Sequence, residues 1–294
     1  MTIFATDAPA KINLCLFVGP RLADGRHELV TVMDSLTLTD DVRVTIGPDD
    51  LAADEVLCPG VEGPNLAAAA ITAFREGTGW DGPPVRVEIT KRIPIAGGMA
   101  GGSADAAAVL RLLAGAADFD DMRRLEDIAA GLGSDVPSQL RGGPMLVTGV
   151  GGRLRRLPPF EPYSALVLLV DAELATADVY AEADRLDLPR DSLELSRALT
   201  RTQAAISSET LLEKVHNDLE PAARSLCPAI EEALEAAREA GSDQAFVSGS
   251  GPTVVALYAG DSHRDRATAA RDALDAHGRS PTPILAKPGG SGAL

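Results

Sequence analysis

The chain has 294 residues and carries 43 acidic against 27 basic side chains, which gives a formal net charge of −16. Hydrophobic residues make up 45% and charged residues 24%, the composition of a folded protein rather than of a disordered one. Nucleic acids and anionic membranes are bound by clustered Lys and Arg, so the acidic balance argues against both as partners. A nucleotide substrate stays compatible with it, because backbone N–H groups and one or two cations suffice for a phosphate pocket.

The cysteines and the apolar runs predict a protein of the cytoplasm. Cys15, Cys58 and Cys227 are odd in number and widely spaced, which favours reduced thiols over disulfides or a zinc site. No apolar run in the sequence reaches the roughly 18 residues of a membrane span. Residues 1–9 lack the basic start and apolar stretch of a signal peptide. The oligomeric state stays open.

The first half of the chain predicts strands at its start and helices later. Alternation is expected to place Ile12, Leu14 and Leu16 on one face of a strand, and Asn13, Cys15 and Phe17 on the other. Further strands are expected at 29–38, 42–46 and 85–90, and helices at 66–76, 104–117 and 122–132.

The second half begins after a break at Leu157-Pro158-Pro159. Strands are expected at 165–170, 245–247, 253–258 and 284–286, and helices at 193–204, 208–216, 227–240 and 263–277. Residues 288–294 are rich in Gly and Ser and are expected to form a loose tail. The mixture predicts an α+β protein of two lobes, with domains at 1–157 and 158–287.

The segment with the strongest chemical signal is rich in glycine and alanine and opens into a helix. It consists of Pro94, Ile95, Ala96, Gly97, Gly98, Met99, Ala100, Gly101, Gly102, Ser103, Ala104 and Asp105. Small residues let backbone N–H groups approach an anion, and the helix start adds the positive end of its dipole. The segment matches neither a Walker A motif nor a dinucleotide fingerprint. The alternative is a flexible glycine loop in which Ser103 only caps the helix.

Three segments resemble the GHMP kinase superfamily in order and spacing: PAKINLCL at 9–16, PIAGGMAGGSADAA at 94–107 and SGSGPTVVAL at 248–257. GRHEL at 25–29 and GSDVP at 133–137 resemble the members that act on 4-diphosphocytidyl-2-C-methyl-D-erythritol. The resemblance spans about residues 8–257. It implies an N-terminal, ATP-binding lobe like domain 2 of ribosomal protein S5 and a ferredoxin-like C-terminal lobe.

The resemblance also implies the reaction. ATP would phosphorylate the 2-hydroxyl of the methylerythritol moiety in the non-mevalonate route to isopentenyl diphosphate, with the ATP phosphates over residues 94–105. Asp135 matches the carboxylate that accepts the hydroxyl proton, and Lys11 matches the lysine that holds this carboxylate ionised. The alternatives are a helix cap for Asp135 and a structural ion pair for both. Mg²⁺ is implied with ATP, with no metal residue assigned beyond a weak indication for Ser103.

The base of the substrate is implied to meet three residues. His27 matches the residue that hydrogen bonds cytosine, and Tyr180 matches the aromatic residue that stacks on it. Arg26 stands where the family usually has Tyr, so a guanidinium plane is expected on the other face of the base. Ordinary packing is the alternative for Tyr180, and a buried or surface role is the alternative for His27.

Other positions carry weaker expectations. Asn13 is implied to contact polar groups of the substrate, and Asn65 matches a position near adenine, although capping of the next helix explains it equally well. Ala96 and Ala100 stand where glycine is common, and both are expected to avoid positive φ. The turn at 248–253 is either a wall of the substrate pocket or an ordinary glycine turn.

Two other functions stay open at this point. One is a different GHMP small-molecule kinase, acting on homoserine or mevalonate, and the other is a non-catalytic binding protein on the same scaffold. Arg26, His27 and Tyr180 favour a pyrimidine pocket and therefore a substrate linked to cytidine diphosphate. The simultaneous presence of Lys11, Ser103 and Asp135 argues against a non-catalytic protein.

Overall fold

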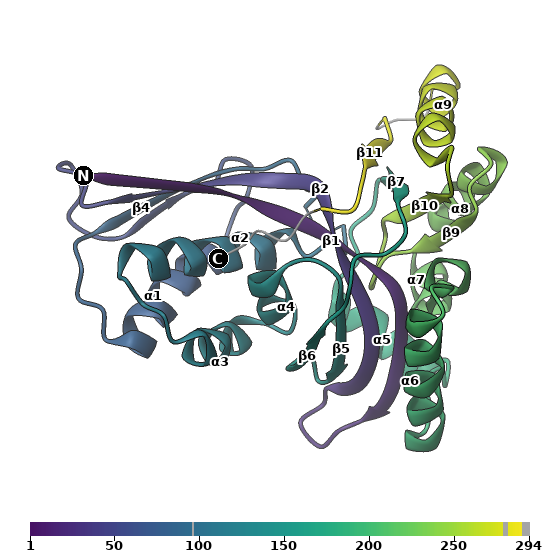
Figure 1. The fold of residues 1–294 in the computed structure, drawn as a ribbon, viewed down its shortest axis with the longest axis horizontal. Coiled ribbons are helices and arrows are strands. Elements are labelled where there is room, and N and C mark those ends of the chain that lie inside the picture. The colour runs from purple at the N-terminus through teal and green to yellow at the C-terminus, as the bar shows by residue number, and fades with distance from the viewer. Residues whose placement is uncertain (96, 279–281, 290–294) are drawn as a thin grey trace.

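The computed structural model describes residues 1–95, 97–278 and 282–289, and it shows an α+β fold built on two β-sheets (Figure 1). The strands are β1 (Thr2–Arg21), β2 (His27–Ile46), β3 (Glu55–Leu57), β4 (Val85–Thr90), β5 (Met145–Gly149), β6 (Arg153–Arg156), β7 (Tyr163–Leu168), β8 (His216–Asn217), β9 (Gln244–Val247), β10 (Val254–Ala259) and β11 (Ile284–Ala286). The helices are α1 (Leu66–Thr78), α2 (Gly101–Ala116), α3 (Met122–Leu132), α4 (Val136–Arg141), α5 (Thr176–Arg185), α6 (Ser192–Ser207), α7 (Glu220–Leu226), α8 (Ala229–Glu239), α9 (His263–Ala276) and the 3₁₀ helix η1 (Leu211–Lys214). The predicted fold class is confirmed.

The first sheet has the order β3-β4-β2-β1-β8, and β5 and β6 extend it from β2. Helices α1 to α4 cluster beside this sheet (Figure 1). The apolar side of α2 is almost completely buried, including Val109, Leu110 and Leu113, and it packs into one core with the apolar residues of β1 and β2. This packing fixes the start of α2 beside the middle of β1.

The second sheet has the order β11-β7-β10-β9, so the chain passes from one sheet to the other between β6 and β7. The lobes are not separate in sequence, because the two-residue strand β8 returns from the second half to pair with β1. The proposed loose tail begins at Pro288, yet Pro288 bridges to Leu36 and the N–H of Gly289 donates to the carbonyl of Ser35. Residues 290–294 of that tail lie outside the described residues.

The alternation expected along β1 is wrong beyond its middle. The pairing of β1 with β2 shifts register between Pro9 and Lys11 and again between Asn13 and Cys15. Because a bulge inserts one extra residue, the side chains beyond it change faces. Leu16 therefore lines the same cavity as Asn13 instead of opposing it.

The longer helices and strands agree with those expected from the sequence. The ranges 29–38 and 42–46 belong to a single strand, β2, and the helix expected at 208–216 is wrong, because η1 and β8 occupy that range. The sequence analysis also missed the short elements α4, α5, α7, β3, β5 and β6.

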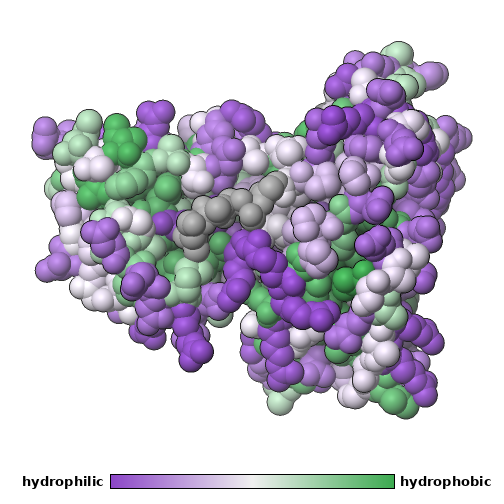
Figure 2. Space-filling model, viewed as in Figure 1, coloured by the Kyte–Doolittle hydropathy of each residue, from purple (hydrophilic) through white to green (hydrophobic). Residues whose placement is uncertain are grey.

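The surface of the molecule is mostly hydrophilic on the face that Figure 2 shows. The hydrophobic side chains lie between the hydrophilic ones in separate groups. Among the helices that the structure describes, none combines the length and the apolar character needed to cross a membrane.

Candidate active site

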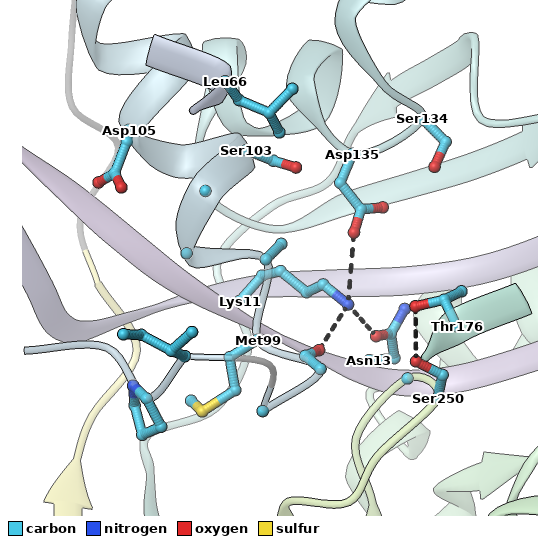
Figure 3. Close-up of a pocket in the computed structure, with 18 of the residues that line it drawn as sticks. Lys11, Asn13, Leu66, Met99, Ser103, Asp105, Ser134, Asp135, Thr176 and Ser250 are labelled. Atoms are coloured by element: carbon cyan, nitrogen blue, oxygen red, sulfur yellow. Dashed lines mark hydrogen bonds and ion pairs between the residues drawn. The ribbon is translucent and has the colours of Figure 1, made fainter. Parts of the chain in front are cut away.

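The ammonium of Lys11 stands at the centre of the predicted site (Figure 3). Its Nζ donates to Oδ1 of Asn13 at 2.7 Å and to the carbonyl of Gly98 at 3.1 Å, and it lies 3.7 Å from Oδ2 of Asp135. The Lys11 side chain is only 7% exposed, whereas that of Asp135 is 28% exposed. The carboxylate of Asp135 is therefore accessible, while the ammonium of Lys11 is buried and held by Asn13 and the Gly98 carbonyl.

The two bulges of β1 explain why Lys11 and Asn13 point into the cavity together. Both residues lie between the register shifts and are two positions apart, so they share one face of the strand. The amide of Asn13 donates to Oγ1 of Thr31, whose hydroxyl donates to the carbonyl of Cys15. This chain fixes the amide oxygen of Asn13 toward Lys11.

Asp135 occupies the N-cap position of α4, but its side chain makes no capping hydrogen bond. The capping alternative for this carboxylate is therefore wrong. The hydroxyl of Ser138 donates to the backbone carbonyl of Asp135 instead, which holds the turn without using the carboxylate. The side chain is left facing Lys11 and the cavity.

The glycine-rich segment leads into α2, which begins at Gly101. Ser103 lies inside the first turn of that helix, so the alternative that it is the N-cap is wrong. Ala100 is the N-cap residue and has a φ of 56°, against the expectation that it avoids positive φ. No side chain caps α2, which leaves its first N–H groups for a ligand. Ala96 lies outside the described residues.

The third predicted motif meets the other two at Gly98 and Gly249. A Cβ on Gly98 would lie 2.7 Å from the carbonyl oxygen of Ser248, and a Cβ on Gly249 would lie 3.2 Å from Nζ of Lys11. Only glycine permits this approach. Asn217, in a segment without an assigned role, donates to the carbonyls of Val247 and Gly249 and so holds the turn in place.

These elements enclose a cavity of about 460 Å³. Its lining includes Lys11, Asn13, Asn65, Pro94, Ile95, Gly97, Gly98, Met99, Ala100, Gly101, Gly102, Ser103, Asp105, Asp135 and Tyr180. Ala104 is buried in α2 and is not part of the lining. Asn65 lines the cavity and also caps α1, because its side chain accepts a hydrogen bond from the N–H of Ala67.

A buried charged cluster lies beside the start of α2 and was missed by sequence analysis, apart from Asp105. Lys91 donates to Asp40 at 2.5 Å and to Asp105 at 2.7 Å, and Asp40 also accepts from the N–H groups of Arg92 and Ile93. Burial raises the pKa of Asp105 to about 6, against the opposing effect of Lys91. The cluster ties β2 to the segment that enters the glycine-rich loop.

A second cavity of about 350 Å³ adjoins the first, and both are lined by Leu29, Ser134 and Tyr180. The rings of His27 and Tyr180 stack with centroids 5.2 Å apart. Burial, followed by the charge of Asp135, raises the pKa of Tyr180 to about 12.

The structure therefore brings His27 onto Tyr180, whereas the sequence analysis expected Arg26 to face that ring across the base. The Arg26 side chain is 64% exposed and pairs with Asp24 at 2.6 Å. Arg26 nevertheless lines the second cavity.

Comparison with known proteins identifies the family to which the chain belongs. A sequence model described as "GHMP kinases N terminal domain" matches residues 65–149, and one described as "GHMP kinases C terminal" matches residues 191–280. A Streptomyces avermitilis protein is 42% identical over 265 residues, covering 85% of this chain and 86% of its own. The chain belongs to the GHMP kinase family. The family predicted from its motifs is confirmed.

Two relatives of the chain share one name. The Streptomyces avermitilis protein and one from Thermobifida fusca are both named 4-diphosphocytidyl-2-C-methyl-D-erythritol kinase. The second is 40% identical over 298 residues, covering 93% of this chain and 95% of its own. A crystal structure of 4-(cytidine 5'-diphospho)-2C-methyl-D-erythritol kinase superposes with a TM-score of 0.75 and 32% identity, covering 98% and 100% of the two chains. A homoserine kinase from Cytophaga hutchinsonii superposes with a TM-score of 0.73 at 17% identity, which shows a shared fold.

Proposed function

We propose that this GHMP kinase transfers the γ-phosphoryl group of ATP to the 2-hydroxyl of 4-diphosphocytidyl-2-C-methyl-D-erythritol, giving the 2-phosphate in the non-mevalonate route to isopentenyl diphosphate. The observation that carries the proposal is the 3.7 Å approach of Lys11 to Asp135 in the cavity that the glycine-rich loop also lines. The glycine-rich loop, which can hold phosphates, and the pair of Asp135 and Lys11 thus face the same cavity. The name shared by the relatives supports the substrate.

A residue of this chain can accept the proton that the substrate hydroxyl loses. Asp135 accepts the proton of the substrate hydroxyl as the bond from that oxygen to the γ-phosphorus forms and the bond from phosphorus to the leaving oxygen of ADP breaks. Lys11 lies beside the carboxylate and adds positive charge where the oxygens of the transferring group gather charge. Asn13 orients Lys11. Lys11 in turn helps to align the substrate hydroxyl with the γ-phosphorus of ATP.

ATP is placed with its phosphates over the uncapped start of α2. The free N–H groups of the first turn and the positive end of the helix favour a polyanion there. Asn65 and Lys91 line the part of the cavity beside this loop, where the rest of the nucleotide would extend.

Mg²⁺ is proposed to accompany ATP. Among the described residues, no three His, Cys, Asp or Glu side chains gather as a metal site. This fits Mg²⁺, which takes its ligands mainly from phosphates and water and needs few oxygens from the protein. The hydroxyl of Ser103 faces the same cavity and would contact the ion, which neutralises phosphate charge when bound.

The second cavity is proposed to hold the cytosine. It opens beside Asp135 through the shared wall at Ser134 and Tyr180, so a substrate with a base at one end and an alcohol at the other can span both cavities. Homoserine and mevalonate have no base to fill it. We place the ATP-binding lobe at 1–157 and the second lobe, which supplies Tyr180, at 158–287.

The test is turnover measured with three acceptors: the diphosphocytidyl substrate, homoserine and mevalonate. We expect ADP release and a 2-phosphate only with the first, and stabilisation against heat by both ATP and cytidine 5'-diphosphate. Phosphorylation of homoserine or mevalonate alone would replace the proposed substrate. Absence of turnover with all three acceptors in a folded preparation would favour the non-catalytic alternative.

A further inference from the structure

Asp184 connects two elements that are remote in sequence at the wall of the second cavity. Oδ1 of Asp184, on α5, lies 2.8 Å from Nε2 of His27, at the start of β2. Its other oxygen, Oδ2, lies 3.6 Å from the guanidinium of Arg21 at the end of β1. The His27 side chain is only 4% exposed, so this contact is shielded from solvent.

The same helix fixes the imidazole from a second direction. Tyr180 and Asp184 are four residues apart on α5 and therefore lie on one face of it. Tyr180 stacks on the ring of His27, while Asp184 binds its edge. The ring can neither tilt away nor flip without losing one of these contacts.

The contact also decides which nitrogen of the ring carries the proton. An ionised carboxylate only accepts hydrogen bonds, so in the neutral ring the proton sits on Nε2 and faces Asp184. Nδ1 is then an acceptor. Within the part of the chain that the structure describes, Nδ1 makes no hydrogen bond, and His27 lines the second cavity.

We propose that Asp184 is a positioning residue that makes the base pocket select cytosine over uracil. The inference rests on the proposed function, in which His27 reads the base. An acceptor at Nδ1 matches the 4-amino group of cytosine, which donates, and opposes the 4-carbonyl oxygen of uracil, which does not. A site whose polar group is left facing another acceptor rejects the wrong ligand strongly, because neither atom finds a partner.

Asp184→Asn tests the inference, because an amide can either accept from Nε2 or donate to it. The tautomer of His27 is then no longer fixed. For the cytidine substrate, we expect KM to rise by about 10–100-fold, the size of effect seen when the hydrogen-bond partner of a metal-binding His is removed. The ratio of kcat/KM for the cytidine and uridine forms of the substrate should fall at least as far, while KM for ATP stays unchanged.

Two further variants separate positioning from general damage. Asp184→Glu keeps an acceptor-only group and should recover part of the selectivity. Glu182→Gln removes a carboxylate from the same helix, but this carboxylate pairs with Arg185 and Ser225 and should leave the selectivity unchanged. Equal cytidine-to-uridine ratios in wild type and Asp184→Asn would overturn the inference.

A measurement on the unmodified protein tests the inference even if a variant does not fold. Two-bond ¹H–¹⁵N NMR spectra distinguish the two neutral tautomers of a histidine. At a pH where the ring is neutral, we expect His27 with its proton on Nε2 and a bare Nδ1. A proton on Nδ1 would overturn the role of Asp184, whereas lack of turnover with the cytidine substrate would overturn the proposed function instead.

Discussion

The amide oxygen of Asn13 accepts a hydrogen bond from Lys11 at 2.7 Å, although both side chains are almost completely buried. A lysine side chain has four rotatable bonds and loses conformational entropy when it is held in one position. Here its ammonium is already held by Asn13 and by the carbonyl of Gly98 before any substrate arrives. Lys11 is therefore preorganised for the role proposed for it beside Asp135.

Lys11→Met should lower kcat by about 10²–10³-fold, the effect expected when one preorganised charge is lost from a transition state. KM for ATP should change little, since the backbone of the loop supplies most phosphate contacts. Steady-state kinetics with the diphosphocytidyl substrate measure both constants. Lys214→Met, which removes an exposed lysine outside the two adjoining cavities, is the matched control. A kcat equal to that of the wild type would make Lys11 a structural residue.

Asp135→Asn should lower kcat by about 10²–10⁴-fold, because an amide cannot accept the hydroxyl proton. The side chain makes no capping bond, but its pairing with the buried Lys11 is lost, so the free energy of unfolding should fall and is measured by urea unfolding beside the kinetics. Calorimetric binding of cytidine 5'-diphosphate should persist. Asp127→Asn, an exposed residue of α3, controls for the loss of charge. Retained turnover would contradict the assignment of the base.

The motifs located the residues proposed as catalytic, because each lies in a segment with a recognisable sequence pattern. Lys11 and Asp135 were predicted as partners, and they lie 3.7 Å apart. The bulges of β1 were not predicted, since a register shift depends on the pairing with β2 rather than on the residues of β1. The positive φ of Ala100 was missed as well, because alanine rarely adopts this conformation and its residue type does not signal it.

Residues that act through remote contacts escaped sequence analysis. Asp184 lies in α5, a helix that no strong pattern announced, and its partner His27 belongs to another element. Asp40 and Lys91 are likewise joined only by folding. The one available signal was the rarity of lysine, which occurs four times in the chain and twice in the site cavity.

Gly98→Ala should destabilise the protein and weaken ATP binding together. Its φ of 72° costs a non-glycine residue about 1–2 kcal/mol, and the added Cβ would lie 2.7 Å from the carbonyl oxygen of Ser248. The loop must move, which breaks the bond from Lys11 to the Gly98 carbonyl. Urea unfolding and the KM for ATP report the two effects.

The control for Gly98→Ala is a glycine near the end of α2, the helix that follows the glycine-rich loop. A Cβ on Gly115, in α2, would meet no atom within 4 Å, so Gly115→Ala should stabilise the protein by about 0.5–1 kcal/mol without changing KM. Equal effects of the two substitutions would show that the close approach of the glycine-rich loop to the turn at Ser248 is unimportant.

The last prediction concerns Asp34, a carboxylate of β2 that is 1% exposed and accepts a hydrogen bond from the hydroxyl of Tyr163 at 2.8 Å. Oδ1 of Asp34 has no partner among the described residues. Burial raises the pKa of Asp34 to about 6, against the opposing effect of Tyr163. The unfolded chain has a pKa of about 3.9 at such a residue, so the folded state binds the proton more tightly.

Asp34 therefore destabilises the folded protein increasingly as the pH rises from about 4 to about 6, where the folded carboxyl loses its proton. Asp34→Asn stays neutral and can still accept from Tyr163. Its free energy of unfolding relative to wild type should be higher at pH 8 than at pH 5, by about 1–2 kcal/mol. Urea unfolding of both proteins at the two pH values measures this difference. The buried Asp105 also has a raised pKa, but its contribution to the pH dependence is the same in both proteins and cancels in the difference. A difference independent of pH would show that folded Asp34 does not change its protonation state in this range and would contradict the raised pKa.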